Sequence, residues 1–568
     1  MDYSILAGKY EKLESVSSKL AKTDIIAEFL KSISFNELSK IVLLLQGRVF
    51  PSHSEYELGI ATQMMIKAIS KASGFSPSRV EDIFKKTGDL GLTAEQCVKK
   101  KTQSSLLKKK LTVDHVFENL QKLATIAGEG SQDKKLNLIS ELIISAKPSE
   151  AIYIVRTILG ELRVGAAEGI IRDAIIQAFL VKKDSSKEEK KDATSAVENA
   201  YGLTNDFGQV AKIAEEKGIK GLQKVSIQLG KPIQVMLGLA AEKIEDVTNE
   251  FGEVICEYKY DGLRIVIEKQ DNKIWLFTRR QEDVTKQFPD IVEMAKQSLK
   301  AKECIVEGEA LGIDQKTGYP LPFQSLGQRI QRKYDIEKMV KEIPVQINLF
   351  DLMYVDGKSF FNIPLKERRE ELEKMLKPIK GKFQLTKSII TKDVKEIEKF
   401  YQEAVKDRQE GLMLKVPNSV YTFGRHVGTM YKIKGVMESL DLVIIGATWG
   451  EGARAKWLTS YEIACKDPST GIFLSCGNIS TGLSEDEYKS MTKELKKIII
   501  SEKGKIVNVK PKIVLEVGYQ NIQKSPHYES GFGLRFPRFI RLREDKGPNG
   551  TDTLERVKSL YKSQGKSG

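Results

Sequence analysis

The first part of the chain repeats apolar side chains at helical spacing. In residues 24–45 and 56–72 they recur at i, i+3, i+4 and i+7, which is the pattern of an amphipathic α-helix. Residues 152–162 and 170–179 repeat this pattern. The run 182–191, KKDSSKEEKK, is polar throughout and predicts a solvated loop between helices. We therefore expect the protein to begin with an all-α region.

From Val254 onward the spacing becomes that of β-strands. The apolar runs 265–267 and 274–277 flank Asp271-Asn272, and this arrangement predicts a β-hairpin. A second change follows Lys434, where short strands alternate with Gly-rich turns, as in a small barrel. These strands are expected at 440–447, 461–465, 472–476 and 513–517, with a final helix at 554–561.

The three patterns predict a multidomain protein, because 568 residues are too many for one core. We expect an all-α domain at 1–222, an α+β domain at 223–435 and a C-terminal β-barrel at 436–568. No apolar run has the length of a membrane-spanning helix, and the first residues lack the basic and apolar segments of a signal peptide. The expected location is the cytoplasm, without a membrane partner, and the expected state is a monomer.

Composition narrows the possible functions. Five cysteines are scattered without the spacing of a zinc site, and their odd number argues against a disulfide framework. Only four histidines are present, which argues against a metal-dependent hydrolase. The net charge of +14 fits a polyanionic partner such as nucleic acid. A lysine-rich solvated surface is the alternative explanation for this charge.

The run CEYKYDGLR at residues 256–264 carries the most informative chemistry. Strand alternation places Glu257 and Lys259 on one face, and Asp261-Gly262 then turns the chain so that Arg264 begins the returning strand. A lysine near other cations loses its proton more easily and can act as a nucleophile. Taken alone, a K-x-D-G sequence is also compatible with an ordinary turn.

Four further charged clusters lie next to apolar strands. They are Thr278–Asp283 with Arg279, Val306–Glu309 with Glu307 and Glu309, Glu410–Lys415, and Tyr431–Lys434 with Lys432 and Lys434. Guanidinium groups bind phosphate, and paired carboxylates favour ribose or Mg²⁺. Each cluster alone could be a solvated strand end, but five in one domain indicate a site for a nucleoside triphosphate and its metal. Phe350 is either a base-stacking residue or part of the core.

In order and spacing, these motifs resemble those of the covalent nucleotidyltransferases, which include DNA ligases, RNA ligases and mRNA capping enzymes. The stretch Gly533–Lys546, GLRFPRFIRLREDK, resembles the last motif of archaeal and eukaryotic ATP-dependent DNA ligases. Residues 440–454 resemble the first part of their oligonucleotide-binding (OB) barrel, and residues 160–165 resemble their helical DNA-binding domain. The resemblance covers essentially the whole chain.

This resemblance implies a helical DNA-binding domain, an α+β nucleotidyltransferase (adenylation) domain and a C-terminal OB-fold β-barrel. It implies an archaeal-type ATP-dependent DNA ligase that seals nicks in double-stranded DNA through lysyl-AMP and DNA-adenylate intermediates, in replication, repair and recombination. ATP would be the AMP donor, and Mg²⁺ or Mn²⁺ the metal. The protein would act at the nucleoid.

The resemblance also implies roles for individual residues. Lys259 would form the lysyl-AMP, Glu257 would contact adenine, Phe350 would stack on the base, and Arg264 and Glu309 would contact ribose or phosphate. The other implied contacts are Arg279, Lys432 and Lys434 for phosphates, Glu309 and Glu410 for the metal, Arg543, Asp545 and Lys546 for adenylation by the OB domain, and Arg163, Gly165, Arg535 and Arg538 for DNA.

Two positions depart from the family pattern. His426 stands where relatives usually have an arginine, with Arg425 beside it, so either residue could fill that nucleotide-binding role. Arg280 follows Arg279 where the family often has an asparagine.

Three other classes of protein share some of these features. A capping enzyme or RNA ligase would share the central domain but would not be expected to carry the long helical region. A DNA-clamping protein with an inactive nucleotide site would need a broken motif, whereas Lys259 and its partner residues are intact here. An NAD-dependent ligase usually has a four-cysteine zinc module, which this sequence lacks.

The sequence Gln103-Ser-Ser-Leu106-Leu107 resembles a sliding-clamp binding motif in which leucines replace the aromatic pair, although an ordinary amphipathic turn would look similar.

Overall fold

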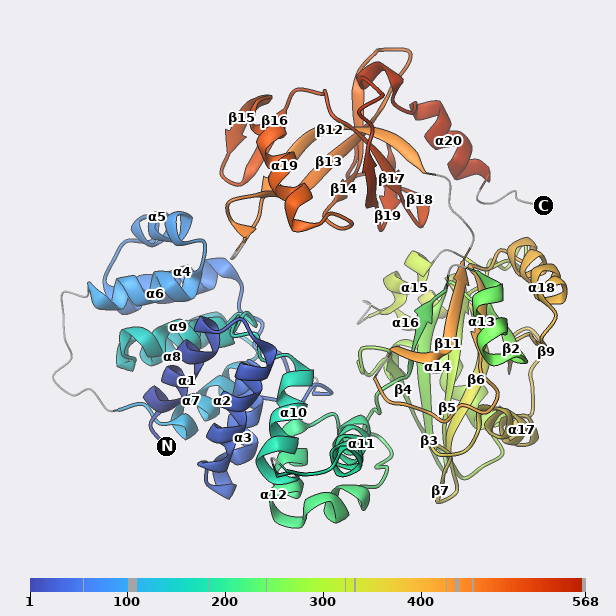
Figure 1. The fold of residues 1–568 in the computed structure, drawn as a ribbon, viewed down its shortest axis with the longest axis horizontal. Helices are drawn as coiled ribbons and strands as arrows, with labels where there is room; N and C mark the ends of the chain where they lie inside the picture. The colour runs from blue at the N-terminus through green and yellow to red at the C-terminus, as the bar shows by residue number, and fades with distance from the viewer. Residues whose placement is uncertain are drawn as a thin grey trace. The chain divides into compact units, whose positions relative to one another are not determined.

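The computed structural model describes the chain apart from residues 55, 101–109, 183, 242, 322, 331–333, 425, 435–438, 452–453 and 564–568. Contacts divide the chain into two compact units, Met1–Lys434 and Gly435–Gly568 (Figure 1). The first unit contains a helical region followed by two β-sheets, and the second is rich in strands. Among the described residues, no helix is both long and apolar enough to cross a membrane.

The helical region consists of α1 to α12. Their bounds are α1 Tyr3–Ser15, α2 Lys19–Lys31, α3 Phe35–Leu45, α4 Thr62–Ser73, α5 Pro77–Thr87, α6 Leu90–Lys99, α7 Val113–Thr125, α8 Ser131–Ser145, α9 Pro148–Ile158, α10 Glu168–Phe179, α11 Lys187–Thr204 and α12 Phe207–Gln223. Several of these helices have an N-cap residue whose side chain accepts a hydrogen bond from a backbone N–H of the first turn. Ser76 does so for α5 and Asp206 for α12.

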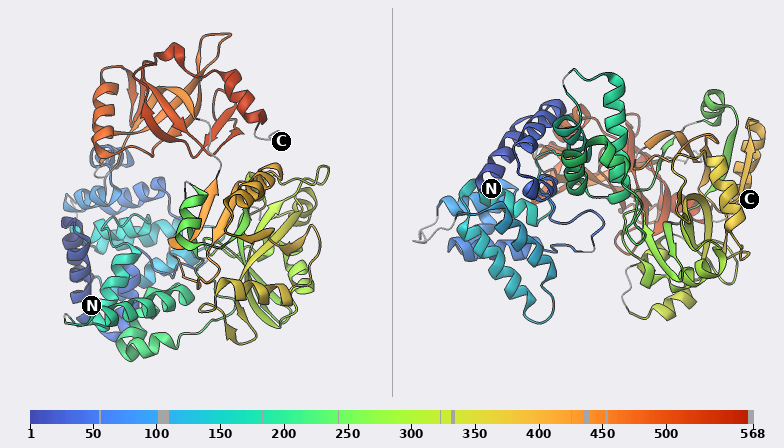
Figure 2. Two further views of the ribbon diagram at one scale, coloured as in Figure 1. Left: turned by 45° about the vertical axis from the view of Figure 1, so that its right-hand side comes forward. Right: turned by 90° about the horizontal axis from the view of Figure 1, so that it is seen from below.

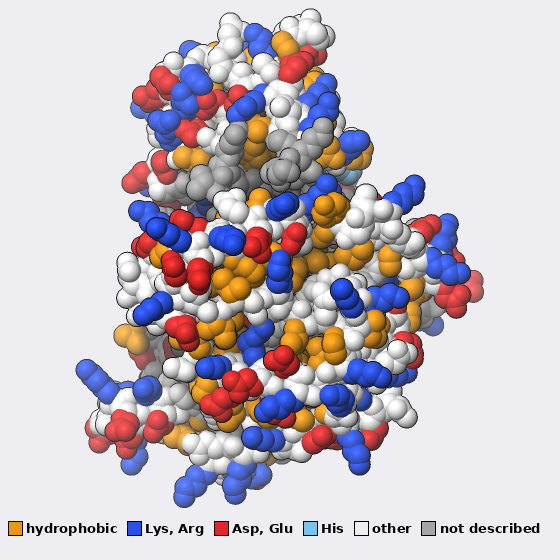
Figure 3. All heavy atoms as spheres, turned by 90° about the vertical axis from the view of Figure 1, so that its right-hand side faces the viewer, with side chains coloured by type: hydrophobic (Ala, Val, Ile, Leu, Met, Phe, Trp, Pro, Cys, Tyr) orange, Lys and Arg blue, Asp and Glu red, His pale blue; other side chains and the backbone are white. Residues whose placement is uncertain are grey.

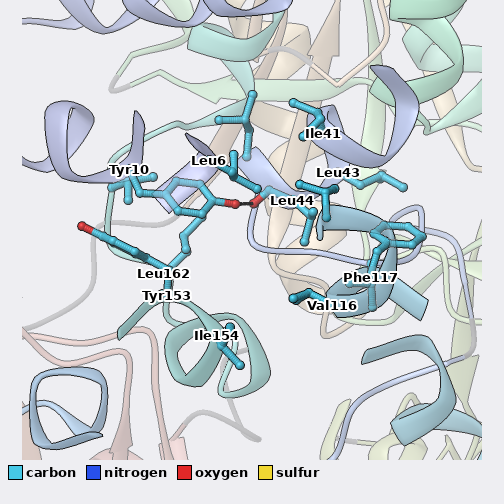
Figure 4. Close-up of a cluster of buried hydrophobic side chains, with 14 of the residues drawn as sticks. Leu6, Tyr10, Ile41, Leu43, Leu44, Val116, Phe117, Tyr153, Ile154 and Leu162 are labelled. Carbon is cyan, nitrogen blue, oxygen red and sulfur yellow. Dashed lines mark hydrogen bonds between the residues drawn. The ribbon is translucent and has the colours of Figure 1, made fainter. Parts of the chain in front are cut away.

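This region has a core of its own, part of which Figure 4 shows. Tyr10 on α1 and Tyr153 on α9 are fully or almost fully buried, with ring centroids 4.9 Å apart. The Tyr10 hydroxyl donates a 2.8 Å hydrogen bond to the carbonyl oxygen of Leu44 on α3. A buried hydroxyl without a partner would destabilise the core, so this bond fixes α1 against α3.

Helical spacing predicted these helices but not all of their ends. Residues 24–45 form two helices rather than one, because the chain leaves helical geometry between Lys31 and Phe35. Residues 56–61 precede α4 and are not helical. The run 182–191 is only partly a loop, since α11 begins at Lys187. The side chains of Ser186 and Glu189 cap its first turn reciprocally, which accounts for a helix within a highly charged run.

The rest of the first unit holds two sheets and their helices. The strands are β1 Leu237–Ala240, β2 Val254–Lys259, β3 Leu263–Gln270, β4 Lys273–Thr278, β5 Glu303–Gly312, β6 Val345–Val355, β7 Lys358–Ser359, β8 Phe383–Leu385, β9 Ser388–Thr391, β10 Gly411–Lys415 and β11 His426–Lys434. The helices are α13 Ile244–Phe251, the 3₁₀ helix η1 Thr285–Gln287, α14 Pro289–Ser298, α15 Phe323–Ile330, α16 Ile336–Glu342, α17 Leu365–Met375 and α18 Val394–Lys406.

The strand order is β1-β11-β10-β2-β9 in one sheet and β4-β3-β5-β6-β7 in the other, where β8 also pairs with β6. Helices α13 and α18 pack beside the first sheet, and α14, α15 and α17 pack beside the second (Figures 1 and 2). The predicted hairpin is present as β3 and β4, and Asp271 in its turn has a φ of 50°.

Each face of the second sheet has its own character. Ile265, Ile267 and Val306 belong to a core cluster that also contains residues of α14 and α17. The alternate positions Val266 and Ile305 belong to a different cluster, and the same alternation puts Glu307 beside Ile305 on that face. The period-two pattern therefore brings polar groups to one face of an otherwise apolar sheet.

The segment between α12 and β1 is bound to this sheet rather than lying apart from it. The backbone N–H of Gly230 donates a 2.7 Å hydrogen bond to the Glu268 carboxyl on β3, which is completely buried. Burial raises the pKa of Glu268 to about 8. Gly230 has a φ of 85°, and a side chain there would meet the Trp275 ring at 2.9 Å. Ile227 and Ile233 pack in the same cluster as Trp275.

The second unit is built on the long strand β12 Leu440–Trp449, which pairs with β13, β16 and β17. Its other strands are β13 Leu458–Lys466, β14 Phe473–Ile479, β15 Ile499–Lys503, β16 Ile506–Val509, β17 Val514–Gly518, β18 Asn521–Lys524, β19 Phe532–Arg535 and β20 Arg538–Leu542. The helices are α19 Glu485–Lys496, the 3₁₀ helix η3 Pro548–Gly550 and α20 Leu554–Ser563.

The strands and the final helix predicted for this unit are present, and α19 is an addition that the strand pattern did not indicate. Ser484 and Glu487 cap its first turn reciprocally. The pairings recorded among the described strands leave β18 and β19 as a separate ribbon, so they do not by themselves close the barrel. The unit is nevertheless strand-rich around one core, in keeping with the predicted OB fold.

Candidate nucleotide site and nucleic-acid contacts

Lys259 is the last residue of β2, and a tight turn connects it to Arg264 on β3. Gly262 in that turn lies against the neighbouring strand: a Cβ there would meet the carbonyl oxygen of Ala310 at 2.4 Å. Only glycine fits so close an approach without a backbone shift. The Asp-Gly turn therefore sets the distance between the amine and the guanidinium.

The Lys259 ammonium donates a hydrogen bond to the carboxylate of Glu410, and the two groups form an ion pair. The backbone N–H of Glu410 also donates to the carbonyl oxygen of Lys259, at 2.9 Å. Gly411, which follows, has a φ of 143°, and a Cβ at this position would lie 2.2 Å from the Ile433 carbonyl oxygen. Glycine at position 411 is thus required for the close approach of β10 to β11, next to the contact between Glu410 and Lys259.

Glu309 completes a cluster of opposite charges. It lies opposite Arg264 in the β3–β5 register. Burial raises the pKa of its carboxyl to about 7, with Glu410 and Asp261 adding to the rise while Lys259 and Arg264 oppose it. The two carboxylates, Glu309 and Glu410, are therefore close enough to influence each other, which is the arrangement expected for a shared cation.

Arg264 is fixed by two contacts. It donates to the Glu307 carboxylate at 2.6 Å and to the Met236 carbonyl oxygen at 2.7 Å. Glu307 is completely buried and also accepts a 3.0 Å hydrogen bond from the Tyr421 hydroxyl. Burial raises the pKa of Glu307, although Arg264 opposes this. The Arg264 Nε is buried and has no hydrogen-bond partner among the described residues, so this edge of the guanidinium still offers a donor to a ligand.

Glu257 lies at the other end of the site and is only 2% exposed. One of its carboxylate oxygens accepts from Arg369 on α17, and the other pairs with Lys415 on β10 at 2.6 Å. The Lys415 ammonium also lies 4.5 Å from the centre of the Phe350 ring, which Arg264 approaches at 5.3 Å. Phe350 is therefore an edge-of-pocket aromatic held between two cations.

Strand alternation predicted the faces of β2 correctly. Cys256 and Tyr258 pack into an apolar cluster with residues of α18, whereas Glu257 and Lys259 make the ion pairs described above.

The sequence did not predict Arg369 as a residue of the site. It comes from α17, far along the chain, where the sequence KERREELEK looks like a charged helix surface. Its Nη1 and Nη2 also donate to the Phe350 carbonyl oxygen at 3.3 Å and to the Ser388 hydroxyl at 3.0 Å.

A narrow pocket opens between the two sheets at these residues. Its lining includes Arg264, Glu307, Phe350 and Lys415, together with Arg368. Arg368 makes a two-pronged ion pair with Asp351 at 2.7 and 3.0 Å and is 1% exposed. Although burial opposes it, Arg368 holds the pKa of Asp351 below its ordinary value. The pocket is thus charged on the inside and apolar at Phe350, and in this structure it is narrower than a bound base and ribose need.

Other predicted nucleotide contacts lie on adjoining elements. Arg279 is exposed in the turn that follows β4, with Arg280 beside it. Lys432 lies on β11 opposite Met413 of β10. The proposed Arg425, the side chains of His426 and Lys434, and the clamp residues Gln103, Leu106 and Leu107 fall outside what the structure describes.

In the helical region, Arg163 and Gly165 lie in the loop between α9 and α10. Both have left-handed backbone conformations, with φ values of 59° and 71°. Arg163 pairs with Asp89 at 3.3 Å and also forms an ion pair with Glu161. Lys22 reaches under this loop and donates to the Val164 carbonyl oxygen at 2.5 Å. The loop is therefore held in a defined shape next to the start of α10.

A larger groove runs between α2, α10 and α11 and begins beside this loop. Ala167 and Gly169 line its end at the start of α10, Leu20 and Ile176 line its apolar wall, and it includes the basic residues Lys19, Lys31, Lys182 and Lys190. By contrast, on the face drawn in Figure 3 the Lys and Arg side chains are interspersed with Asp and Glu, so the positive charge is not gathered there.

In the second unit, Arg543 and Lys546 both contact Asp441 of β12, and Arg543 also pairs with Asp545. Arg535 ends β19 and lies over the exposed ring of Phe536, and Arg538 begins β20 and is exposed. Among the described residues, no group of three or more His, Cys, Asp or Glu could hold a metal ion by itself.

Three family models match the chain. They are the DNA ligase N terminus at residues 2–176, the ATP dependent DNA ligase domain at 235–434 and the ATP dependent DNA ligase C terminal region at 454–546. Among curated relatives, a DNA ligase of Nanoarchaeum equitans is 46% identical and covers 99% of both chains. One from Archaeoglobus fulgidus is 42% identical, covering 98% of this chain and 97% of its own.

Solved structures agree with the fold. The protein named Pmar-Lig_Pre matches with a TM-score of 0.59 at 15% identity, covering 95% of this chain and 99% of its own. Pmar-Lig_PreS3 matches with a TM-score of 0.57 at 16% identity, covering 94% and 99%. At these identities the match concerns the fold alone.

The paired contacts of Glu257 predict a measurable coupling. Arg369→Ala should cost roughly 1–3 kcal/mol of stability, because it leaves a buried carboxylate with one cation instead of two. In a double-mutant cycle with Glu257→Gln, measured by urea unfolding, much of that loss should disappear. Lys374→Ala on the same helix breaks only an exposed pair with Glu371 and should cost less than about 0.5 kcal/mol. Equal losses from both substitutions would show that Arg369 does not stabilise Glu257.

Proposed function

This chain belongs to the ATP-dependent DNA ligases and seals nicks in duplex DNA, and we propose that it does so through AMP carried on Lys259. The observation that supports the proposal most is the convergence of Lys259, Glu410, Glu309 and Arg264 at the junction of two sheets. An amine, two carboxylates and a guanidinium in one cluster are the groups needed to attack and stabilise a phosphate.

In the first step, the Lys259 nitrogen attacks the α-phosphorus of ATP. The N–P bond forms as the bond to pyrophosphate breaks, and the lysine must lose a proton before its lone pair is available. Lys259 is paired with Glu410, so the amine must leave this carboxylate before it attacks. The AMP then passes to the 5′-phosphate of the nick, and the 3′-hydroxyl displaces it to close the strand.

Adenine and ribose would bind beside Phe350 between the sheets, and the narrow pocket there would widen to admit them. Phe350 would stack on the base, and the unpaired Nε edge of Arg264 would donate to the ribose or the α-phosphate. Glu257 would act at the adenine end together with Arg369 and Lys415, whose positions it fixes. Arg279, Lys432, Lys434 and either Arg425 or His426 would contact the phosphates.

Glu309 and Glu410 would hold Mg²⁺ or Mn²⁺. Two carboxylates are fewer than a dedicated metal cage needs, but they suit an ion that takes its remaining oxygens from a nucleotide and water. Burial, and to a smaller extent Glu410, raises the pKa of Glu309, and a bound cation would favour its ionised form. Such an ion would neutralise charge on the phosphate under attack.

DNA would be held by the helical region and by the second unit. The loop carrying Arg163 and Gly165 leads to the start of α10, where free backbone N–H groups favour a phosphate, and the adjoining groove carries lysines. Arg535 and Arg538 would contact the DNA backbone from the second unit. Arg543, Asp545 and Lys546 would serve adenylation. The protein would act at the nucleoid of a cell with archaeal-type ligases, in replication, repair and recombination. It would act as a monomer.

Replacing Lys259 tests the covalent intermediate. Lys259→Ala should abolish labelling of the protein by α-labelled ATP, because no neighbouring group forms the same phosphoramidate. The variant should still close a nick that already carries 5′-AMP, at a reduced rate. Lys273→Ala, in the exposed turn at the opposite end of β3, is the control and should label like the wild type. Label remaining on the Lys259 variant would refute the assignment.

The raised pKa of Glu309 predicts pH-dependent metal binding. The carboxyl is protonated below about pH 7 and ionised above it, so Mn²⁺ should bind more weakly as the pH falls. We expect the Mn²⁺ Kd to rise about tenfold per pH unit below 7, measured by electron paramagnetic resonance with an ATP analogue that has a methylene α–β bridge. In Glu309→Gln the affinity should be low at every pH, whereas Glu303→Gln on the same strand should behave like the wild type. A pH-independent wild-type affinity would contradict the prediction.

We also propose that Gln103, Leu106 and Leu107 bind a sliding clamp. Leucine buries less area than the usual aromatic pair, so the affinity should be modest. Replacing Leu106 and Leu107 together with alanine should remove the stimulation of sealing by the clamp while leaving sealing without the clamp unchanged. Equal stimulation of both proteins would end the proposal.

A further inference from the structure

We propose that Asp441 is a positioning residue for adenylation: its carboxylate holds Arg543 and Lys546 side by side so that they can receive the β- and γ-phosphates of ATP. The proposal rests on the proposed function of the last motif and adds a residue that the motif does not contain. Asp441 lies about a hundred residues earlier in the chain, near the start of β12.

One carboxylate oxygen of Asp441, Oδ2, contacts both Arg543 and Lys546. Arg543 donates from Nη1 to both carboxylate oxygens of Asp441, at 2.8 and 2.7 Å. Lys546 donates to one of the same oxygens, Oδ2, at 2.6 Å. The side chains of Asp441 and Arg543 are only 11% and 14% exposed, so water screens this contact less than it would a surface pair.

Asp441 is itself rigidly held. Its backbone N–H donates to the Asp552 carboxylate at 2.8 Å, and its carbonyl oxygen accepts from the Asp552 N–H at 2.8 Å. On its other side it pairs with Glu516 in the β12–β17 register. The carboxylate is therefore attached to the strand on which the unit is built, which is the position from which it can orient other side chains.

The arrangement overcomes repulsion between the two cations and still leaves donors for a ligand. Asp545 takes the other edge of the Arg543 guanidinium, at 2.9 and 2.7 Å, so the plane of Arg543 is fixed from two sides. Asp441 uses one of the three donors of the Lys546 ammonium. Groups that are already oriented before the phosphates arrive need no reorganisation during the reaction, and this is where their catalytic value lies.

The same strands provide a matched control. Glu516, opposite Asp441, accepts a 2.6 Å contact from Arg541 and a 2.6 Å hydrogen bond from the Ser439 hydroxyl. It is thus a strand carboxylate paired with an arginine of the Gly533–Lys546 stretch, but Arg541 is not one of the residues assigned to adenylation, which are Arg543, Asp545 and Lys546. Asp441→Asn and Glu516→Gln remove the same charge from neighbouring positions.

The test is self-adenylation with α-labelled ATP. In Asp441→Asn, kcat/KM for adenylation should fall about 10–100-fold, mainly through a higher KM for ATP. The pyrophosphate concentration that half-maximally removes the label from the enzyme, by re-forming labelled ATP, should rise by a similar factor, because it reports on binding of the same phosphates. Closure of a pre-adenylated nick should stay within about twofold of the wild type. Glu516→Gln should match the wild type in all three assays.

Two results would overturn the proposal: unchanged or faster adenylation, or an equal loss in closure of the pre-adenylated nick, which would indicate a structural role. If Asp441→Asn does not fold, Asp441→Glu keeps the charge but shifts the shared oxygen by a methylene group, and it should raise the KM for ATP and the half-maximal pyrophosphate concentration together. Wild-type protein that takes no label on Lys259 would refute the proposed function instead, so the two failures are distinguishable.

Discussion

The ion pair between Lys259 and Glu410 is the interaction around which the catalytic part of the molecule is arranged. It exists because β10 runs against β2 closely enough for backbone and side chain to connect the same two residues. Close packing around this pair also leaves no room for a side chain at Gly411, which lies against β11, or at Gly262, which lies against β5. The pair also holds the Lys259 side chain in a fixed position next to Glu309 and Arg264.

A carboxylate shared between two cations recurs in each part of the molecule. Glu257 is shared by Arg369 and Lys415, and Asp441 by Arg543 and Lys546. In the helical region Asp89 is shared by Arg156 and Arg163. Further carboxylates contact two of these clusters: Asp545 pairs with Arg543, and Glu14 and Glu161 pair with Arg156 and Arg163. The shared carboxylates fix the cations in place, and the Glu257 cluster, with Arg369 and Lys415, keeps one net positive charge for a phosphate.

The sequence predicted those parts of the site that depend on short-range patterns. Period-two alternation placed Glu257 and Lys259 together, and the Asp-Gly turn placed Arg264 beside them, because these relations are set within one hairpin. Arg369 and Asp441 were not predicted because their partners are distant in the chain. In addition, Arg369 lies on a helix rich in Arg and Glu, which has the composition of a solvated surface. The charged run 182–191 was predicted to be a loop, but reciprocal capping by Ser186 and Glu189 begins a helix inside it.

The segment that joins the helical region to the sheets has a consequence for dissecting the protein. A fragment started at Val235, where the match to the central family model begins, would lack Gly230 and Ile233. The buried Glu268 would then lose its hydrogen-bond donor, and the Trp275 ring would lose the backbone that covers it. A fragment that contains the catalytic sheets should therefore start soon after α12. The segment between α12 and β1 has the position of a linker in the sequence, but it is part of the core of these sheets.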